Sequence, residues 1–265
     1  MTTHDLLRAY DDELRTDAEM AGAVQVVREG PLHWAVFDHG GFVSYRDLTG
    51  LESEALDELI ECTVAHFRDE TEVASFEWKT RGHDLPADLG VRLAAHGLVA
   101  EPVETVMIGE ATRLAVDVPL ADTPDGPVVV RRIGDGGDPR DDLARMLAAQ
   151  SSVFGDRGPS LESSVTELER GDSEFWIAEV AGQVVSAGRL TPVAGTAFAG
   201  IWGGSTLPAY RGRGIYRALV AARARSAVER GIRYIHSDCT DMSRPILERS
   251  GLQAVTTTTP YVWKR

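Results

Sequence analysis

Cysteine is scarce in this sequence: Cys62 and Cys239 are the two among 265 residues. A pair so far apart gives no disulfide framework and no paired spacing for zinc, and we expect both thiols to be buried or inert. The sequence also lacks an apolar run long enough to span a bilayer. Its first residues, Met1 to Asp5, lack the basic and apolar segments of a signal peptide. A cytoplasmic protein with no membrane partner is expected.

Several catalytic motifs are missing as well. The histidines show no metal-ligand spacing such as His-Glu-x-x-His, so no metal site is expected. No Gly-x-Ser-x-Gly elbow is present for a serine hydrolase. The sequence therefore argues against a metalloenzyme and against a serine nucleophile.

Positive charge is scarce in one half of the chain. Residues 1–125 hold 9 basic against 26 acidic residues, a net charge of −17, whereas residues 126–265 hold 18 against 15, a net charge of +3. Such an excess of negative charge opposes the phosphate contacts of nucleic-acid binding, so no nucleic-acid partner is expected. Between Arg211 and Arg233 the balance reverses, with seven arginines and one acid, a field suited to a phosphorylated ligand.

The length suits two domains, and hydrophobic periodicity outlines their elements. The first half begins with a helix after Thr3 and continues with strands and helices at 23–27, 33–37, 42–45, 52–67, 73–78 and 87–96. A proline- and aspartate-rich connection at 112–127 follows. The second half is expected to hold elements at 128–133, 140–154, 161–170, 174–180, 184–190, 197–206, 214–230, 234–239, 244–250 and 255–263.

The most informative run is Leu207 to Leu219, which reads Leu-Pro-Ala-Tyr-Arg-Gly-Arg-Gly-Ile-Tyr-Arg-Ala-Leu. Two glycines fall at a predicted strand-to-helix turn, where backbone N–H groups and the helix dipole attract an anion. The third glycine of a dinucleotide fingerprint and the lysine of a Walker A motif are both missing. The turn therefore predicts a phosphate site of another kind.

This turn resembles the acyl-CoA signature of the Gcn5-related N-acetyltransferase (GNAT) superfamily, in which Arg or Gln is followed by Gly and then by Gly or Ala. Arg211 and Gly214 fill the first two places, and Tyr216 stands where a small residue is usual. The resemblance covers roughly residue 128 to the C-terminus. It implies an α/β (α+β) fold with a mixed, mostly antiparallel sheet flanked by helices, and acetyl-CoA as the bound cofactor.

The resemblance also implies which residues hold acetyl-CoA. The backbone at Thr206 and Leu207 is expected to contact its acetyl and pantetheine portion. The pyrophosphate is expected on the next turn, at Arg211, Gly212, Arg213, Gly214, Ile215 and Tyr216. Ser243 is a further expected contact, although with Asp241 it also reads as a turn and cap before the helix at Arg244.

The usual catalytic groups of the family are missing from their expected places. Leu247 stands where a tyrosine often protonates the departing thiolate, and Tyr261, Cys239 and Tyr216 are the substitutes, with Tyr261 taken as the candidate acid. The strand at 197–206 has no ionisable side chain to serve as a base. Alternation along 234–239 puts His236 and Asp238 on one strand face as candidate bases. A structural, hydrogen-bonded His236 is the competing interpretation.

A faint internal repeat aligns residues 93–100 with residues 247–254. Each copy closes a short helix with glycine and then becomes extended. This indicates a tandem arrangement: a degenerate, partial GNAT-like domain at 1–115, a linker at 116–127 and a catalytic GNAT domain at 128–265. The first copy lacks Arg-x-x-Gly-x-Gly and is not expected to hold CoA.

These observations predict an acetyl-CoA-dependent N-acetyltransferase whose acceptor, a small-molecule or peptide amine, attacks the thioester directly. The acidic first half favours a cationic acceptor. Two alternatives stay open: a non-catalytic acyl-CoA-binding or sensing protein, and a scaffold whose glycine turn binds another phosphate or nothing. A monomer or homodimer is expected. Arg223, Arg225, Arg230 and Arg233 are expected on a solvated helix face.

Overall fold

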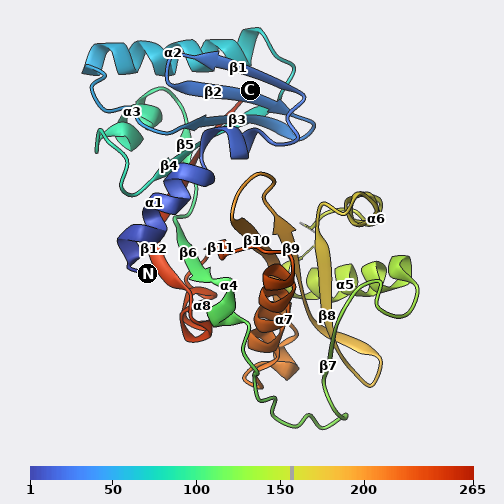
Figure 1. The fold of residues 1–265 in the computed structure, drawn as a ribbon. Coiled ribbons are helices and arrows are strands. Elements are labelled where there is room, and N and C mark those ends of the chain that lie inside the picture. Colours follow the sequence, from blue (N-terminus) through green and yellow to red (C-terminus); the bar gives the residue numbers. More distant parts are fainter. Residues whose placement is uncertain (156–157) are drawn as a thin grey trace. The chain divides into compact units, whose positions relative to one another are not determined.

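The computed structural model describes residues 1–155 and 158–265 and divides into two compact units (Figure 1). The first unit comprises residues 1–106, 238–242 and 254–265. The second comprises residues 107–237 and 243–253. Because three separate stretches of the chain build the first unit, its fold depends on long-range pairing as well as on local sequence.

The first unit is a sheet with helices. Its strands follow the order β1-β2-β3-β4-β12, and β5 also pairs with β12. The β3–β4 pair is parallel, and the pairs β1–β2, β2–β3, β4–β12 and β5–β12 are antiparallel. The strands are β1 (Gln25–Glu29), β2 (Leu32–Phe37), β3 (Gly40–Tyr45), β4 (Ser75–Arg81), β5 (Val99–Ala100) and β12 (Gln253–Lys264). The helices are α1 (Thr3–Glu13), the 3-10 helix η1 (Thr16–Met20), α2 (Ser53–Asp69) and α3 (Leu89–Ala95).

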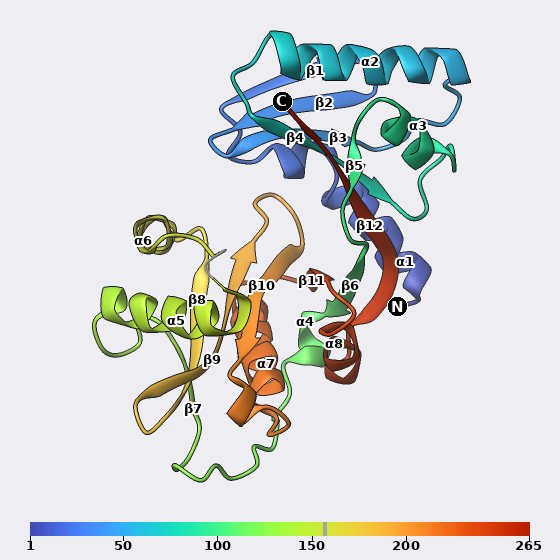
Figure 2. The same cartoon turned by 180° about the vertical axis from the view of Figure 1, so that it is seen from behind.

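One face of this sheet carries the core. Helix α2 runs across the strands β1 to β3 (Figures 1 and 2). Its buried Ile60 and Phe67 belong to the same apolar cluster as Phe76 and Trp78 of β4. Alternation along β4 sends Glu77, Lys79 and Arg81 to the opposite face, so that face is polar.

The C-terminal strand completes the first unit. Seven residues of β12, from Thr258 to Lys264, pair antiparallel with β4 from Arg81 to Ser75. Trp263 of β12 stacks on Phe76 with ring centroids 5.7 Å apart. The predicted boundaries assigned this segment to the C-terminal domain, and the structure differs because strand pairing across about 180 residues leaves no trace in local sequence.

The second unit has the strand order β11-β10-β9-β8-β7, and only β10–β11 is parallel. Strand β6 (Glu104–Glu110) begins in the first unit and ends in the second. The other strands are β7 (Val129–Arg132), β8 (Glu174–Val180), β9 (Gln183–Pro192), β10 (Phe198–Thr206) and β11 (Tyr234–Cys239). The helices are α4 (Ala111–Leu114), α5 (Pro139–Phe154), α6 (Leu161–Arg170), the 3-10 helix η2 (Pro208–Tyr210), α7 (Ile215–Glu229) and α8 (Arg244–Ser250).

Apolar clusters cover both faces of this second sheet. Leu143 and Met146 of α5 pack with Phe175 and Ile177 of β8. Ile215 and Leu219 of α7 pack in a second cluster that includes Ala178, the next residue of β8. Since neighbouring strand residues face opposite ways, α5 and α7 cover opposite faces. Helix α7 is thereby anchored along its length, which fixes the position of its N-terminus.

The same order of elements recurs in the two units. The series β1-β2-β3-α2-β4-α3-β5 corresponds to β8-β9-β10-α7-β11-α8-β12, each with one parallel pair flanking the longer helix. Both short helices end alike: Leu98 N donates to Leu93 O, and Leu252 N donates to Leu247 O, each at 3.1 Å. The glycines between them, Gly97 and Gly251, have φ of 86° and 108°. The sequence repeat is thus also a structural repeat.

The predicted fold class, a mixed and mostly antiparallel α/β fold with a second partial copy, is confirmed. The sequence missed β6, whose residues from Thr105 to Gly109 are all buried and show no alternation of polar and apolar positions. Among the described residues, no helix is long and apolar enough to cross a membrane.

Candidate functional site

The candidate site begins where β10 and β11 separate. Their parallel register joins Phe198 to Tyr234, Ala199 to Ile235 and Gly200 to His236. One residue further along, Ser237 donates its hydroxyl to the Ile201 carbonyl at 3.0 Å. Strand β10 continues to Thr206 along β9, with an irregularity between Trp202 and Ser205. The two parallel strands therefore diverge in the direction of the glycine turn.

The glycine turn has the conformation that the sequence predicts. Gly212 and Gly214 have φ of 75° and 84°, values at which other residues are strained. Helix α7 begins directly afterwards at Ile215, with Gly214 in the N-cap position. The amides of its first turn have no acceptor within the helix and lie at the positive end of the helix dipole. A space at Gly212 stays open, since a Cβ there would meet no atom within 4 Å.

The side chains of the two arginines in the turn are held by hydrogen bonds to backbone carbonyl groups. Arg211 Nε donates to Thr206 O at 3.1 Å, and Arg213 Nη1 donates to Asp122 O at 2.6 Å. Leu207 N donates to Val185 O at 2.9 Å, which ties the end of β10 to β9. Arg211 and Gly212 are exposed, whereas Arg213 and Gly214 are half-buried. The predicted pyrophosphate contacts therefore run from the turn at 211–214 into the first two residues of helix α7.

The connection between the predicted domains packs on this loop. Ala121 N donates to Arg213 O at 3.1 Å. A Cβ at Gly214 would lie 2.8 Å from Pro119 O. Tyr210 also donates its hydroxyl to Asp125 at 2.8 Å. Residues 119–125 therefore form a strap that braces the turn, and this contact is a second reason for glycine at position 214.

Tyr216 stands where the GNAT signature has a small residue, and a glycine in strand β10 leaves room for its ring. A Cβ at Gly204 of β10 would lie 2.6 Å from both Cε2 and the hydroxyl of Tyr216. The ring therefore occupies the space that a side chain at position 204 would need. The bulky residue in the turn and the glycine in the strand compensate each other.

Arg223 is fully buried, so its predicted place on a solvated helix face is wrong. Its Nε donates to Leu219 O and its Nη1 to Arg189 O, each at 3.1 Å. The Tyr216 hydroxyl is a further hydrogen-bond partner. Burial lowers the pKa of Arg223 below its ordinary value, and the interaction with Tyr216 opposes that effect. Most residues of α7 from Ala218 to Ala227 are buried, and Arg223 lies on the side of the helix that packs against β9.

The other three arginines are more exposed, each with a partner of its own. Arg225 Nη1 donates to Val116 O at 2.9 Å, and Arg230 forms an ion pair with Glu174 at 3.0 Å. The Arg233 guanidinium lies 4.9 Å from the centre of the Tyr234 ring. The expectation of solvated positions holds better for these three than for Arg223.

His236 is buried beside the point of strand separation. Its ring meets Trp202 edge-on at 5.3 Å and Phe198 at 6.0 Å, measured between ring centroids. Trp202 lies over Gly200, where a Cβ would meet the indole Nε1 at 2.3 Å. The candidate base and an aromatic side chain thus lie together in the second unit, at the start of the divergence.

Asp238 and Tyr261 belong to the first unit. Lys79 Nζ donates to the Asp238 carboxylate at 2.5 Å. Burial alone would lower the pKa of Lys79, but the attraction of Asp238 raises it above the ordinary value. The Tyr261 hydroxyl packs on α3, 2.1 Å from where a Cβ at Gly90 would be. Asp238 and Tyr261 thus each contact an element of the first unit, strand β4 and helix α3 respectively.

Ser243 and the cysteines complete the list of predicted positions. Ser243 occupies the N-cap position of α8, but its side chain makes no capping hydrogen bond. Of the two thiols expected to be buried or inert, Cys239 is buried and Cys62 is exposed. In the described part of the chain, no group of three or more His, Cys, Asp or Glu side chains is arranged to hold a metal ion.

The corresponding turn of the first unit is built differently. Residues 46–52, between β3 and α2, contain one glycine, Gly50. A pocket of about 230 Å³ beside them is lined by the acids Asp11, Asp47 and Asp84 and by the arginines Arg15 and Arg46. Both arginines already have carboxylate partners, since Arg15 pairs with Asp84 at 2.9 Å and Arg46 pairs with Asp12. With its arginines paired and one glycine in the turn, this end of the sheet is a poor site for a phosphate.

Comparison with known proteins agrees with this geometry. Residues 142–247 match the Acetyltransferase (GNAT) family. The whole chain is similar to a GCN5-related N-acetyltransferase from Kribbella flavida, with 16% identity over 98% of this chain and 93% of that one and a TM-score of 0.65. A GCN5-related N-acetyltransferase from Sphaerobacter thermophilus shares 18% identity over 88% of this chain and 76% of its own, with a TM-score of 0.63.

A third similar structure is a tandem GNAT protein from the clavulanic acid biosynthesis pathway. It shares 14% identity over 90% of this chain and 81% of its own, with a TM-score of 0.58. No curated protein matches the sequence. Residues 142–247, most of them in the second unit, thus match the GNAT acetyltransferase family, and the chain as a whole shares its fold with GNAT structures, one of them a tandem GNAT protein.

Proposed function

We propose that this protein transfers an acetyl group from acetyl-CoA to a primary amine. The observation that carries the proposal is the parallel pair β10–β11, which separates after three paired residues and leads into a glycine turn at the head of α7. A long, flexible thioester with a diphosphate needs such a combination of an open strand edge and a helix N-terminus. The residues present fit both parts.

The turn would hold the diphosphate mainly through its backbone. The amides from Gly212 to Tyr216 supply donors without a side chain in the way, because Gly212 faces open space. Arg211 and Arg213 add positive charge from positions that their hydrogen bonds to Thr206 and Asp122 have already fixed. Such fixed donors lose little conformational freedom on binding. The backbone at Thr206 and Leu207 would hold the pantetheine and acetyl portion.

When bound, acetyl-CoA supplies an activated acetyl thioester. The reaction joins the amine nitrogen to the acetyl carbon, breaks the carbon–sulfur bond and moves one proton from the amine to the thiolate. We assign the first part of that proton transfer to His236, whose imidazole can accept a proton and which lies where the strands separate. Asp238 is the second candidate, but its pairing with Lys79 stabilises the carboxylate and weakens it as a base.

For the proton that the thiolate takes up, we propose a phenol. Tyr216 packs beside Gly204 at the β10 irregularity, and its hydroxyl is a hydrogen-bond partner of Arg223. Tyr261, in the first unit, is the other candidate. Tyr216→Phe and Tyr261→Phe distinguish them. Replacing the residue that acts as the acid should lower kcat and leave the KM for acetyl-CoA unchanged, whereas replacing the other residue should not have this effect.

The first unit would act as a support that does not bind CoA, because its corresponding turn is acidic and has one glycine. A cationic acceptor is favoured by the net charge of −17 over residues 1–125. Faster turnover of cationic than of anionic amines would support this view, and equal rates would refute it. The main alternative is an acyl-CoA sensor, which would bind acetyl-CoA but transfer nothing to any amine.

A matched pair of glycine variants tests the site. Gly212 in the turn and Gly171 at the end of α6 have φ of 75° and 72°, and neither would meet an atom within 4 Å through an added Cβ. Asp at either position should therefore cost similar stability, about 1–2 kcal/mol.

The two variants should differ in acetyl-CoA binding. Gly212→Asp puts a negative charge beside the diphosphate, and we expect affinity to fall about tenfold or more, equal to roughly 1.4 kcal/mol. Gly171→Asp should bind like the wild type. Equal affinities in both variants would show that the turn does not hold the diphosphate. Measuring the release of CoA with a panel of amines then distinguishes a transferase, which releases CoA with an acceptor amine, from a sensor, which releases none.

A further inference from the structure

The first unit holds a pocket that the proposed reaction does not use. Its volume is about 490 Å³, within the range of small-molecule sites. It lies at the start of β3 and β4, at the opposite end of these strands from the acidic turn of residues 46–52. The residues around it come from η1, the β2–β3 turn, β4, β12 and the segment after β5, all in one unit.

Aromatic rings form one wall of the pocket. The rings of Phe37 and Phe42 line it, and His39 stacks on Phe37 at 5.4 Å between ring centroids. Val262 of β12 adds an aliphatic surface. Such rings bury the carbon body of a ligand and present their faces to a positive charge.

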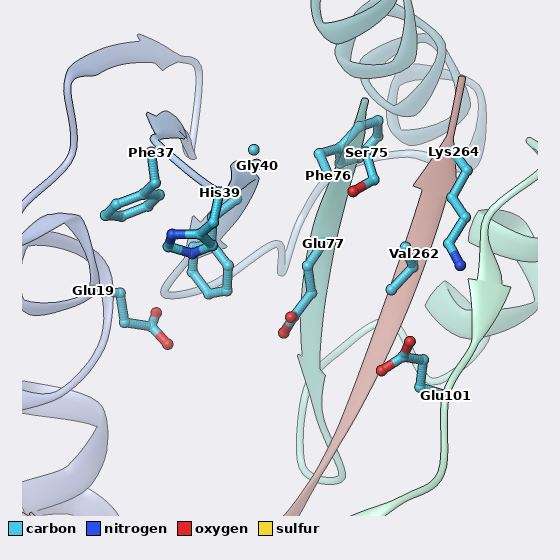
Figure 3. A pocket seen from close by; sticks show the side chains of 12 residues that line it. Glu19, Phe37, His39, Gly40, Ser75, Phe76, Glu77, Glu101, Val262 and Lys264 are labelled. Carbon is cyan, nitrogen blue, oxygen red and sulfur yellow. The ribbon is translucent and has the colours of Figure 1, made fainter. Parts of the chain in front are cut away.

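Carboxylates give the pocket its charge. Glu19, Glu77 and Glu101 line it, against Lys264 as the basic lining residue. Figure 3 shows the carboxylates of Glu19 and Glu77 extending toward the space beneath the His39 ring. Arg81 holds Glu19 in place through an ion pair, and Ser44 donates a hydrogen bond to it. Within residues 1–155 and 158–265, no ion pair within 4.0 Å involves Glu77 or Glu101.

Glu77 is the carboxylate in the least favourable surroundings. It is half-buried in the strand face that also carries Lys79 and Arg81. Burial raises its pKa above the ordinary value; Lys79 opposes this effect, Glu101 and Glu19 add to it, and Arg81 opposes it. A ligand with a positive charge would offset the cost of burying this carboxylate. Since no described cluster has the arrangement of a metal site, the positive charge fits an organic cation with an apolar body.

We propose that this pocket binds a small organic ammonium ion, with the ammonium group between Glu19 and Glu77 and the carbon body against the aromatic wall. The site is separate from the acetyl-transfer site and does not depend on the proposed function. It gives the first unit a binding role of its own.

Calorimetric titration of the full-length protein, without acetyl-CoA, tests the proposal with phenethylammonium as the probe. Saturable one-site binding with a Kd below about 1 mM is expected, and the neutral 2-phenylethanol should bind at least about tenfold more weakly. The proposal would be overturned if 2-phenylethanol bound with comparable affinity. It would also be overturned if phenethylammonium gave no heat of binding at roughly 10 mM, a concentration about tenfold above the expected upper limit of Kd.

Variants locate the site. Glu77→Gln removes the charge at nearly constant size and should weaken binding about tenfold or more, whereas Glu29→Gln, on the exposed strand β1, should have no effect. Unchanged affinity in Glu77→Gln would place the ammonium elsewhere, including at an acceptor site, and refute the proposal. If Glu77→Gln does not fold, Glu19→Gln, at the other carboxylate assigned to the ammonium, replaces it, with weaker binding expected and unchanged binding contradicting the assignment.

Discussion

Gly188 of β9 lies directly under the buried guanidinium of Arg223. A Cβ at this position would meet Arg223 Nη1 at 2.6 Å, Cζ at 3.0 Å and Nη2 at 3.3 Å. The guanidinium cannot swing into solvent, because Arg223 has no exposed surface, and its hydrogen bonds to Leu219 O and Arg189 O hold it in place. Gly188→Ala therefore forces either a shift of β9 away from α7 or the loss of these hydrogen bonds.

The size of the effect follows from these contacts. Overpacking a closed interior by one methyl group costs about 1–3 kcal/mol. Loss of one hydrogen bond from a charged donor costs a comparable 1.5–3 kcal/mol, roughly, so neither route of relaxation is cheap. The usual gain from replacing glycine, about 0.4–1 kcal/mol through the unfolded chain, is smaller. We expect a net loss of about 1–2 kcal/mol in the free energy of unfolding.

Denaturant unfolding of four proteins measures this: wild type, Gly188→Ala, Arg223→Met and the double variant. Because a methionine can move aside, Gly188→Ala should cost almost nothing in the Arg223→Met background, a coupling of about 1–2 kcal/mol. Gly136→Ala is the matched control, since an added Cβ there meets no atom within 4 Å, and it should not destabilise. A harmless Gly188→Ala, or the same loss in both backgrounds, would refute the assigned position of Arg223.

Two further predictions concern stability. Hydrogen bonds with Arg131 lower the pKa of the buried Asp142 below its ordinary 3.8, so this carboxylate stabilises the fold above that pH and loses its effect as the pH falls through the lowered value. Asp142→Asn should lower the free energy of unfolding by about 3 kcal/mol at pH 7. In chemical unfolding, the difference in this free energy between wild type and variant should become smaller below pH 3.8. A difference that does not change with pH would contradict this. Deletion of residues 254–265 removes the neighbour of β4 and the Trp263–Phe76 stack, so limited proteolysis should cut within residues 1–106 first, whereas unchanged protection would show that β12 is dispensable.

Local sequence patterns were sufficient to predict most elements of this fold. The apolar stripe of α2 is an example: Leu56, Ile60 and Phe67 are buried as their spacing predicts. The two glycines at 212 and 214 both adopt the positive φ that the turn requires. Backbone conformation in such places depends on residues near in sequence, and it can therefore be read from them.

Features that depend on distant contacts could not be predicted in this way. Arg223 resembles a solvated residue of an arginine-rich helix, and only the packing of α7 against β9 shows that it is buried. The pairing of β12 with β4 and the ion pair of Asp238 with Lys79 join residues more than 150 positions apart. The role of Gly204 depends equally on Tyr216, in another element. The candidate anion site was therefore predictable, whereas the surroundings of the catalytic candidates were not.

The central claim is that the β10–β11 divergence and the glycine turn hold acetyl-CoA. Calorimetric titration of the purified full-length protein with acetyl-CoA tests it most directly. We predict saturable binding of one acetyl-CoA per chain, with affinity about tenfold or more lower in Gly212→Asp and unchanged in Gly171→Asp. Absence of binding at millimolar acetyl-CoA would contradict the transferase and the sensor alike, and would leave the tandem fold without a cofactor.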